Sequence, residues 1–473
     1  MTETDDTADF RIEKDSLGEV RVPRHRYWGA QTERSRLNFP IGHELMPLEV
    51  IRALAWIKKA CAHANVECGV LPPEKARLIA DVCDEIIAGD LDSEFPLRVW
   101  QTGSGTHTNM NVNEVIVNRA HVRIGGNLVD AHRELHPNDD VNKSQSSNDV
   151  FPSAMNVAAH QLIESQTLVK LRVLRDALGE KAEEFMPIVK IGRTHLMDAT
   201  PLRLGQEFSG YTAQLDQRLV ALHVASLRLT QLALGGTAVG TGLNAPARFA
   251  DRAIERLGDL TGFRFVPAPN RFAAQAAHDD LVEVSGALKA TSVSLMKIGN
   301  DLRLLCSGPR AGLAELVMQP TEPGSSIMPG KVNPTQVEAL TMVCAQVLGN
   351  DLAASVGGMA GQLELNAFKP VIIFNVLMAA RNLGDAAQSF AERAIASLEA
   401  DSLVIEAHLE RSLMLVTALS PHIGYERAAK IAQKAHRDHS TLRQAALSLG
   451  WVNGADFDRW VDPKRMLGPL EER

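Results

Sequence analysis

Apolar residues recur at helical spacing along much of the chain. Steps of three, four or seven residues separate the members of two sets, which are Phe208, Tyr211, Leu215, Leu219, Leu222 and Leu229, and Leu281, Val284, Leu288, Leu295 and Leu302. This spacing places the side chains on one face of a helix. Similar patterns over 153–186, 334–365 and 370–398 predict three more helices. Such helices are roughly 40 Å long, and five of them predict a long helical bundle.

Parts of these helices are apolar on more than one face. The clearest case is the set Leu219, Val220, Leu222, Val224 and Leu227. A helix that is apolar on two faces is buried on both, here within the bundle and against another subunit. The alternative is a monomer in which the terminal regions cover the helices. We expect an oligomer.

Proline and glycine positions divide the chain into three regions. Prolines between residues 23 and 96 break the first part into shorter helices and loops, and the apolar piece 18–22 predicts a strand of a minor hairpin. We expect an N-terminal mixed, mainly helical domain over 1–143, a central helical-bundle domain over 144–402 and a small C-terminal helical domain over 403–473. The predicted fold class is mainly α.

The composition is that of a globular protein without a nucleic-acid partner. Hydrophobic residues make up 45% of the chain and charged residues 22%. The formal net charge is -8, and Lys and Arg are mixed with Asp and Glu along the whole length. No basic face is therefore expected for a phosphate backbone. A few cationic groups in a cleft are still enough for a small anionic substrate.

The cysteines and the hydropathy bear on the compartment. Five scattered cysteines without a CxxC pair predict buried, reduced thiols and no disulfide framework or iron–sulfur cluster; they are Cys61, Cys68, Cys83, Cys306 and Cys344. The acidic segment 1–10 lacks the basic start and apolar run of a secretory signal. No stretch approaches the roughly twenty uninterrupted apolar residues of a membrane span. We expect a cytoplasmic protein with no membrane partner.

Two polar clusters stand out in the first third of the chain. The first is GSGTHTN over 103–109, where glycines allow close approach of a ligand and hydroxyls can donate to carboxylate oxygens. It reads equally well as a turn before a helix. The second is HPNDDVNKSQSSND over 136–149. A solvated loop entering a helix near Pro152 explains its aspartates, but explains less well the neutral, donor-rich run 144–148.

A pair of histidines in the same region invites a zinc interpretation. His132 and His136 lie four residues apart around a glutamate, in the order His-Arg-Glu-Leu-His. The zinc-protease pattern needs the glutamate directly after the first histidine, and Pro137 ends any helix at this point. We therefore expect no metal.

The third cluster is GRTHLMD over 192–198. A lone histidine is usually a structural group. His195, however, lies between Thr194 and Asp198, close to the turn-forming Gly192 and Pro201. Because histidine is the natural proton carrier near neutral pH, this setting favours a function in proton transfer.

The fourth cluster is GSSIMPGKVN over 324–333. Its glycines and proline rule out a regular helix, so Ser325 and Ser326 are expected on a flexible loop. Asn333 predicts the N-cap of the next helix, with Pro334 in the first turn and Gln336 completing a capping box.

The position of a lysine in this cluster predicts an anion site. Lys331 lies just before the predicted helix, where the helix dipole is positive. A cation at that end is unfavourable unless both share an anion. The helix N-terminus and Lys331 therefore point to bound negative charge.

The run GSSIMPGKVNP over 324–334 resembles the signature loop of the fumarase/aspartase superfamily, whose members eliminate across a carbon–carbon bond to give fumarate. The likeness covers nearly the whole chain. Aspartases usually carry Gln and Ala in place of His195 and Gly330, and the runs 136–139 and 192–195 resemble class II fumarases. The resemblance implies a metal-independent, cofactor-free hydratase of the tricarboxylic acid cycle that converts fumarate reversibly to (S)-malate by anti addition. An aspartate ammonia-lyase and a catalytically inactive helical scaffold are the alternatives.

The resemblance also implies a set of site residues. Ser325 matches the catalytic serine, His195 the proton-transferring histidine and Glu338 the acid paired with it. The residues that match those holding the substrate are Ser104, Gly105, Thr106, Ser146, Ser147, Asn148, Thr194, Ser326, Lys331 and Asn333. A second anion site is implied at Arg133, His136, Asn138 and Asp139. The expected assembly is a homotetramer of three-domain subunits around a twenty-helix core, with each active site built from three subunits.

Overall fold

The computed structural model describes residues 10–469. Helices hold 62% of the residues and strands 8%, which confirms the predicted mainly α class. The chain forms two compact units. The first contains the residues up to 169, 220–292 and 344–384, and the second contains 170–219, 293–343 and the residues from 385 onward. The three-domain division expected from the sequence stays a prediction, and its segment 1–9 lies outside the described residues.

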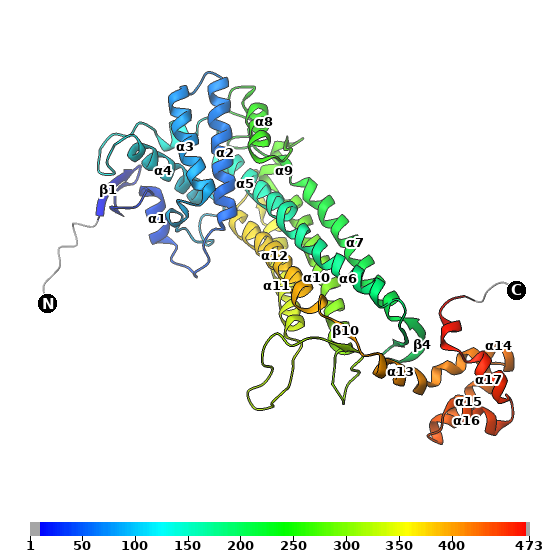
Figure 1. Ribbon diagram of the computed structural model, residues 1–473. Helices are drawn as coiled ribbons and strands as arrows, with labels where there is room; N and C mark the ends of the chain where they lie inside the picture. The colour runs from blue at the N-terminus through cyan, green and yellow to red at the C-terminus, as the bar shows by residue number, and fades with distance from the viewer. Residues whose placement is uncertain (1–9, 470–473) are drawn as a thin grey trace. The chain divides into compact units, whose positions relative to one another are not determined.

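The first unit is organised around α2 (Leu48–Glu67). Its Ala- and Ile-rich sequence buries side chains on several faces, and it packs against three helices, which are α3 (Pro73–Ala88), α5 (Ser147–Leu162) and α8 (Phe249–Thr261) (Figure 1). A proline begins α3, and Gly89 ends it in the left-handed conformation that glycine adopts without strain.

Smaller elements complete the first unit. The predicted hairpin is formed by β1 (Phe10–Asp15) and β2 (Gly18–Pro23), paired in antiparallel register. The other elements are α1 (Ala30–Asn38), α4 (Thr106–Arg123), α9 (Arg271–Ala276), β5 (Gln231–Leu232), β6 (Val266–Pro267), β8 (Gly361–Gln362), β9 (Leu365–Asn366), a 3-10 turn (Asp92–Glu94) and a π-turn (Pro137–Val141).

The long predicted helices are present. They are α6 (Leu168–Glu184), α7 (Leu204–Arg228), α10 (Asp279–Leu305), α11 (Thr335–Met359) and α12 (Lys369–Phe390). Two predicted boundaries were wrong. The helix expected from about Pro152 begins at Ser147, because Ser146 and Asp149 form a capping box and Pro152 is accommodated inside the helix. A π-turn over Ile163–Thr167 then separates α5 from α6.

The ends of the last two long helices also differ from the prediction. α11 ends at Met359, earlier than the expected residue 365, and the short β8–β9 hairpin follows it. α12 passes into a π-turn over Ala391–Ile395. After α12 the apolar pattern continues because Ala394, Ile395 and Leu398 remain buried, whereas after α11 Leu363 is exposed at the tip of the hairpin.

The second unit contains the hairpin of β3 (Val189–Thr194) and β4 (Met197–Arg203), and the pair β7 (Leu316–Val317) and β10 (Glu399–Ala400). Its remaining elements are α13 (Ser402–Arg411), α14 (Ser420–Ile423), α15 (Tyr425–Arg437), α16 (Leu442–Leu449), α17 (Gly454–Trp460) and 3-10 turns over Leu413–Leu419 and Pro463–Met466. In α15, Ala428, Ile431 and Ala435 follow helical spacing and are buried in a small apolar core.

Candidate active site

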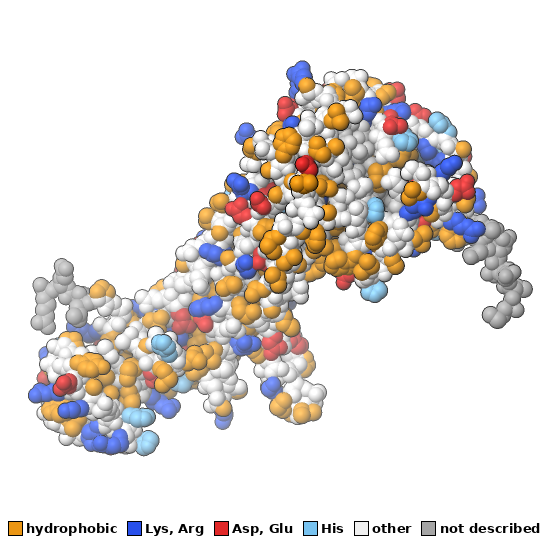
Figure 2. All heavy atoms as spheres, turned by 180° about the vertical axis from the view of Figure 1, so that it is seen from behind, with side chains coloured by type: hydrophobic (Ala, Val, Ile, Leu, Met, Phe, Trp, Pro, Cys, Tyr) orange, Lys and Arg blue, Asp and Glu red, His pale blue; other side chains and the backbone are white. Residues whose placement is uncertain are grey.

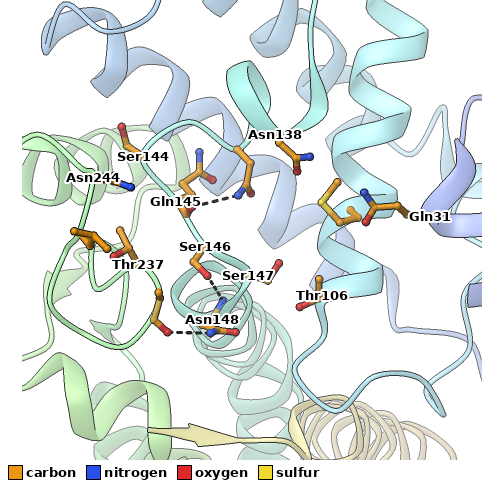
Figure 3. Close-up of a pocket in the computed structure, with 14 residues that line it drawn as sticks. Gln31, Thr106, Asn138, Ser144, Gln145, Ser146, Ser147, Asn148, Thr237 and Asn244 are labelled. Atoms are coloured by element: carbon orange, nitrogen blue, oxygen red, sulfur yellow. Dashed lines mark hydrogen bonds between the residues drawn. The ribbon is translucent and has the colours of Figure 1, made fainter. Parts of the chain in front are cut away.

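A polar cavity of about 520 Å³ lies in the first unit (Figure 3). It is lined by Gln31, Thr106, Met110, Asn138, Asn142, Ser144, Gln145, Ser146, Ser147, Asn148, Thr237, Ala238, Leu243 and Asn244. Four residues of the predicted substrate set line it, namely Thr106, Ser146, Ser147 and Asn148. None of the lining side chains carries a formal charge, so the polar side-chain groups of the cavity are amides and hydroxyls.

The loop 103–106 forms one wall of this region. A side chain at Gly103 would bring its Cβ to 1.5 Å from the Ala367 carbonyl oxygen, and one at Gly105 would meet the Phe151 ring at 2.5 Å. Gly105 also has φ +76 and directly precedes α4. The Ser104 and Thr106 hydroxyl oxygens lie 2.8 Å apart. The interpretation as a turn before a helix is confirmed, whereas binding of a ligand by these hydroxyls stays a prediction.

The start of α5 joins the cavity wall to a second loop. The buried carboxylate of Asp149 accepts from the backbone N–H of Ser146 at 2.9 Å, of Gly235 at 2.9 Å and of Thr237 at 3.0 Å. Burial raises the pKa of Asp149 to about 6 against these stabilising bonds. Asn148 Nδ2 donates to the Ala238 carbonyl at 2.9 Å.

The second loop is a part of the site that the sequence analysis missed. Residues 235–244 read GGTAVGTGLN, with four glycines in ten residues, and they bring Thr237, Leu243 and Asn244 to the cavity. The dense glycine content was the available signal. The sequence alone does not distinguish this glycine-rich loop from an ordinary connection between helices. The distinction depends on the hydrogen bonds from Gly235 and Thr237 to Asp149, which hold the loop at the cavity wall.

A neighbouring amide sets the direction of the Ser147 hydroxyl. Asn109 Nδ2 donates to Ser147 Oγ at 2.9 Å. Because an amide nitrogen only donates, Ser147 Oγ is the acceptor in this contact and its own hydrogen is left to donate. The cavity therefore presents Ser147 as a donor, which suits a carboxylate ligand.

His195 lies in the second unit, at the tip of the β3–β4 hairpin. The two-residue turn between Thr194 and Met197 has His195 at φ 56 and Leu196 at φ 62, the pattern of a type I′ turn. Such turns usually contain asparagine and glycine, and a bulky residue in this conformation costs roughly 1–2 kcal/mol. Both side chains are exposed in the single chain. The turn therefore holds a histidine outward at a cost in backbone strain.

Buried ion pairs hold the base of this hairpin. Arg193 pairs with Glu315 at 2.7 Å, and Lys190 pairs with Glu315 at 2.9 Å. Lys190 also contacts Glu207 at 2.8 Å. Burial opposes ionisation of Glu315, but Arg193 and Lys190 outweigh it, so the pKa of Glu315 lies below its ordinary value. The network ties the hairpin to the segment that leads into the serine loop.

The serine loop, 318–334, holds Ser325 in a backbone cradle. Ser325 Oγ accepts from the N–H of Ile327 at 3.3 Å and of Met328 at 3.0 Å. A cavity of about 330 Å³ beside the loop is lined in part by Ser325 and Lys331. Two N–H groups aimed at one hydroxyl oxygen favour negative charge on that oxygen.

The predicted capping box at α11 was wrong. Asn333 Oδ1 accepts from Lys331 Nζ at 2.8 Å, and Asn333 Nδ2 donates to the Gly324 carbonyl at 2.6 Å. Gln336 Oε1 accepts from Ser389 Oγ at 3.0 Å. The Asn333 side chain therefore bonds to Lys331 and Gly324 within the serine loop. It does not cap α11, which begins at Thr335.

The remaining predicted site residues are at the surface. Thr194 and Ser326 are exposed, and Glu338 is exposed in the first turn of α11. Within residues 10–469 of the single chain, no hydrogen bond joins Glu338 to His195. Their pairing stays a prediction.

The predicted second anion site is only partly open to a ligand. Asn138 lines the cavity of the first unit, and His136 Nδ1 accepts from the N–H of Asn138 at 3.3 Å and of Asp139 at 3.1 Å. Arg133 donates to the carbonyls of Asp130 and Leu128, to Asn118 and to Glu13. Because its guanidinium already has these partners, an anion would have to share or displace them. The second site stays a prediction.

Metal ligands and thiols can be surveyed over the same residues. Among residues 10–469, His, Cys, Asp and Glu side chains form no group of three or more that could hold a metal ion.

All five cysteines are free. Cys61, Cys83 and Cys344 are buried as expected, whereas Cys68 and Cys306 are partly exposed, so the expectation of uniformly buried thiols was wrong for these two.

Comparison with known proteins identifies the family of the chain. Residues 18–349 match the family model described as Lyase, and residues 415–468 match the model described as Fumarase C C-terminus. The chain is thus a lyase of the fumarase/aspartase superfamily. The chain is 56% identical over 463 residues to a class II fumarate hydratase of Pasteurella multocida, covering 98% of this chain and 100% of the relative.

A eukaryotic relative and a solved structure extend the comparison. The mitochondrial fumarate hydratase of Danio rerio is 56% identical over 97% of this chain and 90% of its own length. The crystal structure of a class II fumarase from Schistosoma mansoni superposes with a TM-score of 0.94 at 43% identity, covering 97% of this chain and 99% of that chain. The chain belongs to the class II fumarate hydratases. It is a hydro-lyase whose substrates are the dicarboxylates fumarate and malate, and these relatives favour it over an aspartate ammonia-lyase.

Proposed function

We propose that Ser325 is the base and His195 the water-side proton carrier in the reversible anti hydration of fumarate to (S)-malate. The observation that carries this assignment is the pair of backbone N–H groups on Ser325 Oγ. A serine is a poor base at its free pKa. Donors already aimed at the hydroxyl oxygen stabilise the alkoxide that must form when it takes the C3 proton of malate.

Removal of that proton leaves an aci-carboxylate with two negative charges on one end of the substrate. Lys331, held beside Asn333 in the same loop, supplies positive charge at this end. His195, paired with Glu338, protonates the departing hydroxyl and in the reverse direction activates the attacking water. Thr194 and Ser326 complete this half of the site.

The other half of the site holds carboxylates through neutral donors. Ser104, Gly105, Thr106, Ser146, Ser147 and Asn148 are the proposed residues. The orientation of the Ser147 hydroxyl by Asn109 supports this role, because a carboxylate needs donors and the hydroxyl still has its hydrogen to give. Arg133, His136, Asn138 and Asp139 remain the proposed second anion site.

We propose further that the active site is composite and that the assembly is a homotetramer with a twenty-helix core. The first-unit cavity has no charged lining, while the serine loop and the histidine hairpin carry the reacting groups and are exposed in the single chain. Subunit association would cover these groups and exclude water from them.

Exposed apolar stripes support the oligomer. On α11, Leu348, Leu352, Val356 and Met359 follow helical spacing and are 44%, 66%, 47% and 77% exposed. By length and composition alone, α11 is long and apolar enough to cross a membrane. Only 33% of its apolar window is buried in the single chain, so most of this window needs a cover. Figure 2 shows apolar side chains reaching the surface in numbers on the face seen from behind. A subunit interface is the natural cover for such a surface.

The predicted two-faced segment of α7 behaves in the same way. Leu222 is buried, whereas Val220, Val224 and Leu227 are 64%, 55% and 47% exposed. Sedimentation at several concentrations tests the assembly, and a monomer that retains full activity would contradict it. We also propose a cytoplasmic location, which the five free cysteines favour because reduced thiols persist in that compartment.

Replacement of the serine tests the assignment of the base. In Ser325→Ala, kcat for malate dehydration should fall by orders of magnitude, while the oligomer and the binding of a non-reacting dicarboxylate persist. Ser448→Ala is the matched control, since Ser448 is an exposed serine of α16 that donates only to the Ala445 carbonyl among the contacts of the described residues. Near-normal kcat in Ser325→Ala would remove Ser325 from the role of base.

A further inference from the structure

The lining of the first-unit cavity contains no positive charge to balance a bound carboxylate. A bound dicarboxylate brings two negative charges, and the fourteen lining side chains of the cavity include no cation. Moving an anion out of water into a site of neutral groups is costly unless positive charge lies close by. A cation behind the lining would lower that cost without narrowing the cavity.

Such a cation is present in α2. Lys58 is fully buried, and its Nζ donates to Asn142 Oδ1 at 2.8 Å and to Gln145 Oε1 at 3.0 Å. Asn142 and Gln145 both line the cavity. The ammonium group therefore lies one side chain away from the ligand space.

We propose that Lys58 is a positioning residue for dicarboxylate binding, which orients the amide network behind the cavity and supplies its positive charge. The proposal rests on the assignment of this cavity to the substrate carboxylates. Lys58 does not line the cavity. It acts on a bound ligand by orienting the side chains of Asn142 and Gln145 and by the electrostatic attraction of its charge.

The hydrogen bonds show how the orientation is passed on. With their oxygens turned to Lys58, Asn142 and Gln145 use their amide hydrogens on backbone carbonyls of the turn 141–145. This turn leads directly into Ser146 and Ser147. Without the ammonium group, the two amide oxygens would lose a charged donor and the side chains could rotate.

A second branch of the network reaches a proposed ligand-binding hydroxyl. Asn142 Oδ1 also accepts from Asn109 Nδ2 at 3.2 Å and from Asn113 Nδ2 at 3.3 Å. Asn109 donates at the same time to Ser147 Oγ. The orientation of Asn142 therefore contributes to keeping Ser147 a donor toward the cavity.

The groups around Lys58 decide its charge state. Cys61 lies on the same helix, Cys83 on α3 and Asp149 on α5, while α4 presents the neutral amides of Asn109 and Asn113. Burial raises the pKa values of both thiols, so they stay neutral. Burial lowers the pKa of Lys58 to about 8, so the ammonium is charged at neutral pH and loses its proton as the pH rises through that value.

The test measures binding of succinate, a dicarboxylate that cannot undergo the reaction, together with steady-state malate kinetics. In Lys58→Met the Kd of succinate and the KM of malate should rise by about tenfold or more, with a smaller change in kcat, because a charged hydrogen bond is lost behind the binding groups. In the wild type, the Kd of succinate should rise as the pH passes about 8, the pKa of Lys58 in the free enzyme. Lys58→Met should lack that rise.

Two further variants separate charge from packing. Lys58→Gln keeps a donor and removes the charge, and it should bind succinate as poorly as Lys58→Met. Lys59→Met is the matched control, because Lys59 is the next residue of the helix and contacts Asp84 at the surface. It should leave succinate binding unchanged. Wild-type affinity in a folded Lys58→Gln would overturn the proposal.

Failure of this inference can be told from failure of the proposed site. If Ser147→Ala and Asn148→Ala leave succinate binding unchanged, the cavity is not the carboxylate site and both ideas fall. If those two variants weaken binding but Lys58→Gln does not, only the role of Lys58 is lost. If Lys58→Met does not fold, Lys58→Gln and the pH dependence of succinate binding by the wild type still decide the question.

Discussion

The cavity of the first unit and the serine loop of the second unit are built in opposite ways. The cavity wall is part-buried, and each of its proposed groups has its orientation set by a neighbour, as Asn109 sets Ser147 and Asp149 holds the loop at Thr237. The serine loop and the histidine turn are exposed, and His195 occupies a strained backbone conformation. Rigid neutral groups suit binding, whereas the proposed reacting groups lie on exposed segments with fewer fixed contacts.

This contrast predicts that chemistry and binding can be damaged separately. Variants of the second unit should lower kcat, and variants of the cavity wall should raise KM. A cavity-wall variant that lowers only kcat, or a second-unit variant that raises only KM, would contradict this division.

The largest effect is expected at the histidine turn. His195→Asn removes the imidazole but keeps a residue that tolerates the left-handed conformation of the turn. We expect kcat to fall by about 10²–10⁴-fold with succinate binding little changed, because general acid–base assistance is lost. Steady-state kinetics and calorimetry measure both. A large loss of binding with unchanged kcat would reverse the proposed division.

The next effect concerns the base of the hairpin. Glu315→Gln leaves Lys190 and Arg193 without their buried carboxylate and should lower the free energy of unfolding by about 3 kcal/mol at pH 7. Because the pKa of Glu315 lies below its ordinary 4.5, its contribution is present above that value and is lost as the pH falls through the folded pKa.

Thermal unfolding of the wild type and Glu315→Gln should therefore converge in acid. Glu406→Gln, at an exposed position of α13, serves as the control and should unfold like the wild type at every pH. A gap between wild type and Glu315→Gln that does not narrow as the pH falls below 4.5 would argue against an ionised Glu315 as the cause.

A substitution in the cavity wall should act on binding. Gly103→Ala forces the loop away from the Ala367 carbonyl, which the new Cβ would approach to 1.5 Å. We expect a loss of about 1–3 kcal/mol in stability and a raised KM for malate, with kcat less affected. Gly210→Ala, in a helix with open space around the added Cβ, is the control and should be neutral or slightly stabilising. An unchanged KM in Gly103→Ala would show that the loop does not shape the site.

The smallest effect is expected at the neighbour of His195. Leu196→Gly removes the side chain that the left-handed conformation penalises, so the free energy of unfolding should increase by about 1 kcal/mol. Chemical denaturation measures it. A loss of kcat alongside the gain in stability would indicate that the strained turn also limits the motion of the imidazole.

Several features were predictable because they depend on local sequence. The long helices follow from apolar spacing over many residues, and the β1–β2 hairpin follows from a short apolar segment. The clusters at 103–109, 144–148 and 324–333 were visible because polar and glycine-rich runs are rare in a chain rich in Ala and Leu. Residue types alone therefore indicated an anion site, and the resemblance of the run 324–334 added the elimination chemistry.

Other features depend on which distant groups meet, and local pattern does not contain that information. Asn333 is a good N-cap by type, yet Lys331 and Gly324 take its side chain. Lys58 reads as an ordinary lysine of an amphipathic helix, and only the packing of α2 against α5 buries it behind the cavity. Glu315 likewise acquires its role only from the hairpin above it.

The sequence by itself determined the helical class and the family and supplied the proposed reacting groups, because these follow from periodicity and from motifs read along the chain. The tertiary structure decided the partners of each polar group, the loop 235–244 as a cavity wall and the burial of Lys58. The physical reason is that burial and long-range hydrogen bonds set orientation and pKa, and both depend on contacts between residues far apart in the chain.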